Sequence, residues 1–392
     1  MKILIRAGAI LATAAVVAAT VMPVLADTAT NDTTGAESTN MTSVKNINSV
    51  SITNVSDAYI NNDVKSFSST GHNVASENTM GGTILTGDAR TEVSILNSAN
   101  INTNLVNLGA SNGGSTAGNS ITGHKSGNFA DVLNQNSVNV LNDNTAVLQN
   151  KVCASSSTGG NVADENTDGN GGTILTGDAT TLVSLQNRVN DSATQVSGLG
   201  SFGVNVLGNS ITGAESTNMA NIKNLNSVVV SNISDASILN DVHAFAKTGH
   251  NFANENTMGG AVLTGDAQVG LELLTDANIN TTAIDAGMDE TEAISGNSIT
   301  GHKSVNFTDL LNQNSISVLN ENNKGLSRDA GDYKDVKWGV VNKDFDVADT
   351  GGNVADENTY PSSIATGIAM AGKLIRVCLN DTLTTIGAFL PM

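Results

Sequence analysis

Apolar and polar positions alternate with a period of two over much of the chain, and the apolar residues are mostly β-branched or small. Stretches such as Ser49–Ile52 and Val138–Leu141 show this pattern, which is typical of β-strands. Helical periodicity is weak after the first 26 residues. No proline occurs between Asp27 and Tyr360, so strand pairing can continue through this region without a break. The pattern predicts an all-β fold.

These predicted strands belong to an internal repeat. The segment TGHNVASENTMGGTILTGDA begins at Thr70, and near-copies begin at Thr158, Thr248 and Thr350. A larger unit of 88 or 90 residues begins at Thr34, Thr122, Thr212 and Thr300. The first and third units open with TGAESTNM and the second and fourth with TGHKS, which gives the order A-B-A-B. Such repetition indicates a solenoid, in which each coil stacks on the one before.

Thr-Gly pairs also recur inside each unit, most often at intervals of 16, 18 or 36 residues. From these intervals we expect a parallel β-solenoid (β-helix) with coils of about 18 residues, extending from residue 27 to residue 323. Roughly 17 coils at ~4.8 Å each would form a rod on the order of 80 Å long.

Asparagine recurs at fixed places in the copies. This residue tolerates left-handed backbone in turns, and stacked asparagines bond to one another. We therefore predict structural ladders from the asparagines that lie three and eight residues after the first Thr of each copy: Asn73, Asn78, Asn161, Asn166, Asn251, Asn256, Asn353 and Asn358.

The final segment, residues 324–392, departs from this pattern. It is charged, it lengthens the fourth unit by about 14 residues, and it contains the only tryptophan. Because an open solenoid edge needs cover, we expect a divergent C-terminal cap or attachment segment here. Trp338 and Tyr333 would either pack inside this cap or form a binding platform.

Residues 1–26 have the features of a secretory signal peptide. Lys2 and Arg6 precede an apolar stretch that ends in small residues at Ala26; an uncleaved membrane anchor is the alternative. Cleavage would leave 16 basic and 37 acidic residues, a net charge of −21. Nucleic acids are bound through Lys and Arg, so this charge disfavours them as partners. We expect an extracellular or cell-surface protein that is not integral to the membrane after cleavage.

One segment resembles the first half of a calcium loop. Asp164, Asn166 and Asp168 supply oxygen ligands at alternate positions, but the twelfth position is Leu175 instead of an acid. Two extra residues in a turn are the alternative explanation, and a looser calcium site would use Asp178. We expect no other cofactor and no catalysis, since no nucleophile-elbow, zinc-protease or phosphate-loop motif occurs.

The pattern Gly71-x-Asn73-x-Ala75-x-x-Asn78 resembles the curlin repeat of bacterial amyloid fibre subunits, with Asn in place of the usual Gln. The whole chain resembles the Asn/Gly/Thr-rich repeat proteins of bacterial surfaces. This resemblance implies an exported solenoid or fibre component.

We therefore expect a structural protein of an envelope layer, fibre or adhesin stalk, which associates with itself or with other envelope components. The alternatives are a glycan- or surface-binding adhesin and, less in keeping with the composition, a polysaccharide lyase or hydrolase. Loss of glycan binding in Trp338→Ala would favour the adhesin.

Overall fold

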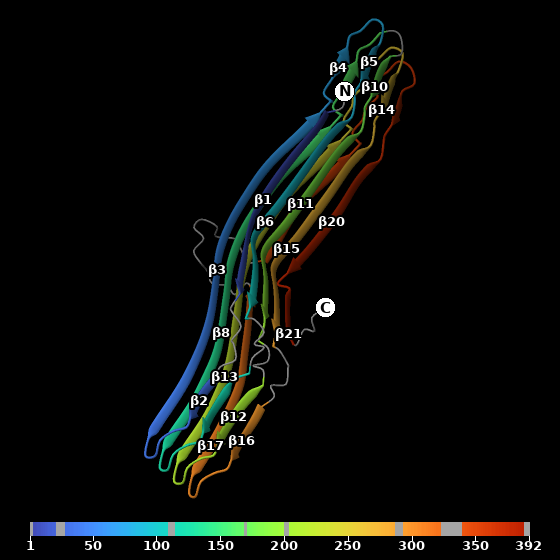
Figure 1. Cartoon of the computed structure of the whole chain (residues 1–392). Helices are drawn as coiled ribbons and strands as arrows, with labels where there is room; N and C mark the ends of the chain where they lie inside the picture. Colours follow the sequence, from blue (N-terminus) through green and yellow to red (C-terminus); the bar gives the residue numbers. More distant parts are fainter. Residues whose placement is uncertain are drawn as a thin grey trace.

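The structure is a computed structural model that describes residues 3–20, 28–108, 114–167, 171–199, 204–286, 293–322 and 339–387. Every regular element in these ranges is a β-strand, which confirms the predicted all-β class. The strands stack side by side in parallel, so the fold is a β-solenoid (Figure 1). The described residues contain no helix that could cross a membrane.

One coil consists of a short strand, a very long strand, a turn region with short strands and a long return strand. The first coil contains β2 (Thr28–Asp32), β3 (Thr39–Ser69), β4 (Val74–Ser76), β5 (Gly82–Leu85) and β6 (Ala89–Asn107). The second contains β7 (Thr116–Ser120), β8 (Gly127–Ser157), β9 (Val162–Asp164), β10 (Gly172–Leu175) and β11 (Ala179–Ser197).

The third and fourth coils repeat this order. The third contains β12 (Asn205–Ser210), β13 (Thr217–Lys247), β14 (Gly260–Leu263) and β15 (Ala267–Asp285). The fourth contains β16 (Ala293–Ser298), β17 (Val305–Asn322), β18 (Gly339–Asp349), β19 (Ser363–Ala365), β20 (Ala369–Leu379) and β21 (Thr382–Gly387).

The register shows that the predicted coil of about 18 residues is wrong. Val50 lies opposite Val138, which lies opposite Val228, so neighbouring layers are 88 or 90 residues apart. One coil is therefore the whole repeat unit, and the solenoid has four coils. The Thr-Gly pairs mark corners within a coil: Thr70 Oγ1 donates to the Gly87 carbonyl across one turn, at 2.8 Å. Their intervals measure the distance between corners, not the distance between layers.

Coils of this width give the molecule a different shape from the expected rod. A strand of 31 residues spans ~100 Å, whereas four layers add up to only ~19 Å along the stacking direction. The molecule is a long curved blade whose strands run along its length (Figure 1). The expected rod of many coils, with its long axis along the stack, is replaced by a short stack of very wide coils.

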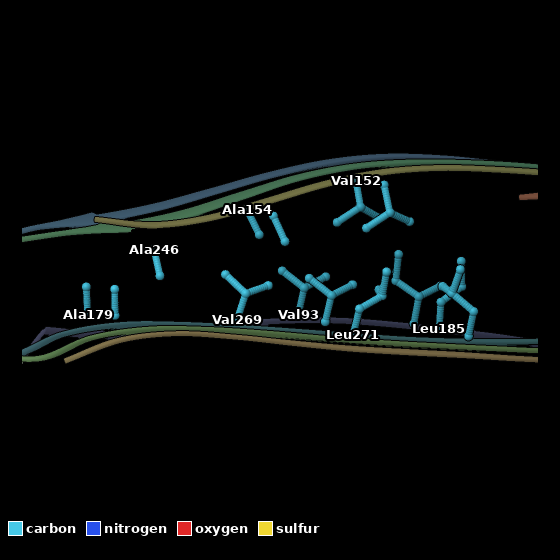
Figure 2. Close-up of a cluster of buried hydrophobic side chains, with 14 residues drawn as sticks. Val93, Val152, Ala154, Ala179, Leu185, Ala246, Val269 and Leu271 are labelled. Atoms are coloured by element: carbon cyan, nitrogen blue, oxygen red, sulfur yellow. The ribbon is translucent and has the colours of Figure 1, made fainter. Parts of the chain in front are cut away.

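The core is a thin layer between two sheets. Side chains of β6, β11 and β15, such as Leu185 and Val269, point toward Val152 and Ala154 of the facing sheet (Figure 2). The described residues of this cluster are all Val, Ile, Leu or Ala. Small and branched side chains suit two sheets that lie close together, which explains how the chain folds with only 3% aromatic residues.

The segment predicted as a cap continues the fourth coil. Val305 pairs with Thr217, an offset of 88 residues, whereas Gly339 pairs with Ser237, an offset of 102. The 14 additional residues are therefore accommodated between two correctly registered strands. β19, β20 and β21 then pair with β14 and β15, so residues 339–387 form the last layer and cover the third coil.

At the other end, β1 (Ile3–Thr20) pairs in parallel with β6, with Ile3 opposite Ala89. It occupies the layer before the first coil, on this sheet alone. The prediction that residues 1–26 are a signal peptide concerns processing, and it remains a prediction. Its removal would leave β6 with an open edge, as β2, β3 and β5 already have.

Candidate functional site

The predicted ladder asparagines form hydrogen-bonded columns at the corners. Asn73 donates through Nδ2 to Asn161 Oδ1 at 2.9 Å, and Asn161 donates in the same way to Asn251 at 2.8 Å. Asn251 continues the column to Asn353 at 2.8 Å. The second Nδ2 hydrogen of Asn161 is taken by the Thr158 carbonyl of its own turn, at 2.8 Å. Each inner amide is thus satisfied by its neighbours although it is fully buried.

Similar columns run through the long strands, where we did not expect them. Asn142 lies in β8 with no exposed surface, and it donates to Asn232 Oδ1 at 2.7 Å. Its own Oδ1 accepts from Asn54 at 2.8 Å and from Asn104 of the facing sheet at 2.9 Å. These amides link coils along the stack and also link the two sheets across the core. The available signal was the recurrence of Asn at inward-facing positions of every unit.

Backbone contact between coils explains the recurring glycines. A Cβ added to Gly159 would lie 2.0 Å from the Gly249 carbonyl oxygen, and one added to Gly71 would lie 1.9 Å from that of Gly159. Such distances exclude any side chain. The corner therefore needs glycine because of the coil stacked beside it.

The candidate calcium ligands do not form a common site in the described residues. Asn166 Oδ1 accepts both the backbone N–H and Nδ2 of Asn78, which uses both of its lone pairs. Asp178 lies at another corner, where its Oδ1 accepts the N–H of Asp266 at 2.9 Å. Asp164 ends β9, and one of its oxygens is buried without a hydrogen bond. Asp168 lies outside the described residues.

The same corner is acidic. Glu255 has a raised pKa because Asp164, and after it Glu357, repel a second negative charge. The described residues contain no group of three or more His, Cys, Asp or Glu side chains that could hold a metal. Both candidate platform residues, Tyr333 and Trp338, also lie outside the described part of the chain. The cysteines Cys153 and Cys378 are free thiols on different sheets.

The outer face of the long sheet carries a shallow groove of about 470 Å³. It forms because Ser155 of the second coil lies between Phe67 of the first and Phe245 of the third. The two phenyl rings form its walls, and Cys153 and Ser155 lie in its floor. This alternation of large and small side chains follows directly from the A-B-A-B order of the units.

Two carboxylates of the terminal coil point inward: Asp344, which is opposite Val242 and pairs with Lys373 Nζ of the facing sheet, and Asp346. Asp346 lies opposite Ala244 and continues a column that contains Ala154 and Ser66. Burial, and after it the nearby Asp344, raise the pKa of Asp346, whereas Lys373 and His243 oppose this shift. Its Oδ1 is buried and has no hydrogen-bond partner within the described part of the chain.

We predict that Asp346→Asn stabilises the protein at neutral pH. A raised carboxyl pKa means that the folded wild type binds the proton more tightly than the unfolded wild type does. The stability that this proton gives to the wild type is fully present below the unfolded pKa of about 3.9. It is lost as the pH rises through the folded pKa. The urea midpoint of Asp346→Asn should therefore exceed that of the wild type at pH 7, and the two should converge near pH 3. An unchanged difference across this range would contradict the prediction.

Comparison with known proteins adds no functional information: no protein-family model, no curated protein and no solved structure matches the chain significantly. The fold and its repeated polar columns define the class, a parallel β-solenoid repeat protein with coils of 88 to 90 residues.

Proposed function

We propose that the protein is a non-catalytic structural component of the cell surface or the extracellular space, exported by the segment up to Ala26. One observation supports this most: the asparagines and glycines that recur in the sequence make their contacts with the neighbouring coil. In this proposal the repeated residues build a continuous wall and do not form a pocket for chemistry. The partners are further copies of the chain or other envelope components.

The acidic composition supports an exposed location. A mature charge of −21 keeps a large surface soluble, and it repels polyanions such as nucleic acids. We propose no cofactor.

Location is tested on intact producing cells with gold-labelled antibodies against the protein. We expect labelling at the surface or in extracellular material without permeabilisation, and an exported chain that begins at Asp27. Labelling that appears only after permeabilisation would contradict the proposal. A cytoplasmic protein of similar abundance serves as the control for leakage.

A glycan-binding adhesin is the second candidate, and the groove between Phe67 and Phe245 favours it. Aromatic rings beside hydroxyl groups present an apolar wall and polar contacts to a sugar. Binding on a glycan array that is lost in Phe245→Ser, but kept in Phe345→Ser on the neighbouring coil, would assign this function. Absence of binding would leave the structural function as the better explanation.

A further inference from the structure

We propose that copies of this chain stack head to tail, with the fourth coil of one copy against the first coil of the next. The proposal rests on the structural function above and names its partner as a second copy of the chain. Among the described residues, both terminal coils have strands with a neighbour on one side only: β3 pairs with β8 alone, and β17 and β18 pair with β13 alone. β6 gains an open edge as well when cleavage removes β1. Such edges present unpaired backbone groups to another chain.

The asparagine columns give these two ends a direction. In the columns that run through β3, β8, β13 and the fourth coil, the Nδ2 of one coil donates to the Oδ1 of the following coil, as from Asn48 to Asn136 at 3.0 Å and from Asn226 to Asn314 at 2.8 Å. The first coil therefore ends on an acceptor and the fourth coil on a donor. Two first coils would oppose acceptors, so only head-to-tail contact continues the column.

Side-chain exposure agrees with a missing neighbour at each end. Asn136 and Asn226 of the inner coils are buried, whereas Asn48 is half-buried and Asn314 is exposed. The adjacent apolar column behaves alike: Val138 and Val228 are 1% exposed, and their terminal equivalents are only partly buried. A second copy would complete the burial in both columns at once.

The A-B order supplies matching charges. The column Glu37, Lys125, Glu215 and Lys303 alternates in sign, and Lys125 Nζ lies 3.8 Å from Glu215 Oε2 between the second and third coils. The fourth coil is of the B type and the first is of the A type. Head-to-tail contact therefore places Lys303 of one copy beside Glu37 of the next, in the same arrangement as Lys125 and Glu215.

Two buried polar atoms also become neighbours in this arrangement. Ser66 is 3% exposed, and its Oγ has no hydrogen-bond partner among the residues that the structure describes; Asp346 Oδ1 is likewise buried without one there. They occupy opposite ends of one inward-facing column. Stacking brings them one layer apart, ~4.8 Å between backbones, where the Ser66 hydroxyl can donate to the Asp346 carboxylate.

Both terminal coils have room for the contact because they carry glycine where only a neighbouring coil requires it. A Cβ on Gly249 would lie 1.8 Å from the Gly351 carbonyl oxygen, yet a Cβ on Gly351 itself would meet nothing nearer than Asp349 Oδ1 at 3.5 Å. At the other end, a Cβ on Gly123 would lie 2.2 Å from the Gly35 oxygen, whereas one on Gly35 would meet nothing within 4 Å.

These glycines provide a matched pair of blocking variants in the exported chain that begins at Asp27, in which β1 no longer covers β6. Gly35→Val closes the first coil to a partner, and Gly351→Val closes the fourth. The added Cβ of neither variant has a backbone atom of the described residues within 4 Å, so both variants should keep the far-ultraviolet circular dichroism and urea midpoint of the wild type. Sedimentation velocity at rising concentration then reports the assembly state.

We expect the wild type to form a concentration-dependent series of oligomers, seen by electron microscopy as ribbons ~100 Å wide with ~19 Å added per copy. Each blocked variant alone should stay monomeric. An equimolar mixture should form a one-to-one dimer and nothing larger, because one open first coil and one open fourth coil remain. The dimer also shows that both variants are folded.

Three results would overturn the proposal: a wild type that stays monomeric, a single variant that dimerises with itself, or a mixture that stays monomeric while the wild type assembles. As a second, milder test, Lys303→Glu should weaken assembly several-fold, and adding Glu37→Lys in the same chain should restore it. None of these results depends on where the protein resides in the cell, so failure here and failure of the surface location are separate.

Discussion

Replacing Asn142 by alanine should lower the free energy of unfolding by about 2–4 kcal/mol, because it leaves several buried groups without partners at about 1–3 kcal/mol each. Asn232 Oδ1 loses its donor, and the Nδ2 groups of Asn54 and Asn104 lose an acceptor. Asn104 and Asn232 are buried, so their side chains cannot turn to bulk water while the core stays closed. Urea unfolding followed by circular dichroism measures the change.

Two further substitutions separate the amide from other effects. Asn142→Leu keeps the side-chain volume but removes the amide, so it should cost nearly as much as the alanine variant. Asn320→Ala, at the outer end of the same column, should cost less than about 1 kcal/mol, since water can replace the lost bond. Asn320 is half-buried. Equal losses at Asn142 and Asn320 would contradict the role of burial in these columns.

Gly159→Ala should destabilise the protein by roughly 3 kcal/mol or more, because the added methyl group overlaps backbone that cannot move independently. Its Cβ would lie 2.0 Å from the Gly249 carbonyl oxygen and 2.9 Å from the carbonyl carbon of Thr248. The second and third coils would have to separate at this corner, which would also lengthen the hydrogen bonds between Asn161 and Asn251.

Gly351→Ala is the matched control, since it occupies the same corner of the last coil. Its Cβ has no backbone neighbour, so the stability should stay within about 0.5 kcal/mol of the wild type. Both variants are compared at a protein concentration low enough to keep the chain monomeric. A loss at Gly351 as large as that at Gly159 would show that glycine is needed there for the turn and not for the stacking.

The sequence predicted the all-β parallel solenoid because strand alternation and exact recurrence are both local, readable features. The coil length was misread because Thr-Gly occurs at every corner, and corner spacing carries no information about which corners stack. Only the 88- and 90-residue recurrence, at which Val50, Val138 and Val228 coincide, reports the layer spacing. The larger period, and not the smaller one, therefore gives the coil length.

The asparagine columns at the corners were predicted from the sequence, whereas those in the long strands were not. Asn73 and Asn161 lie next to glycine in a turn, where asparagine has a familiar role. Asn142 and Asn150 lie in strands among Val and Leu, where the polarity of asparagine, taken alone, predicts an exposed side chain. Their burial becomes intelligible only when an identical amide lies directly above and below, which is a property of the stack and not of the local sequence.

The fourth coil shows how such a protein can change. Its strands pair with the equivalent positions of the third coil both up to Asn322 and from Gly339 onward. The offset in residue number rises from 88 to 102, because 14 more residues lie between these points than in the earlier units. Loop closure becomes only about 0.6 kcal/mol more costly for each doubling of length. Additional residues can thus be inserted between two strands of a coil at low thermodynamic cost. This junction is therefore a suitable place for an added recognition or tagging sequence.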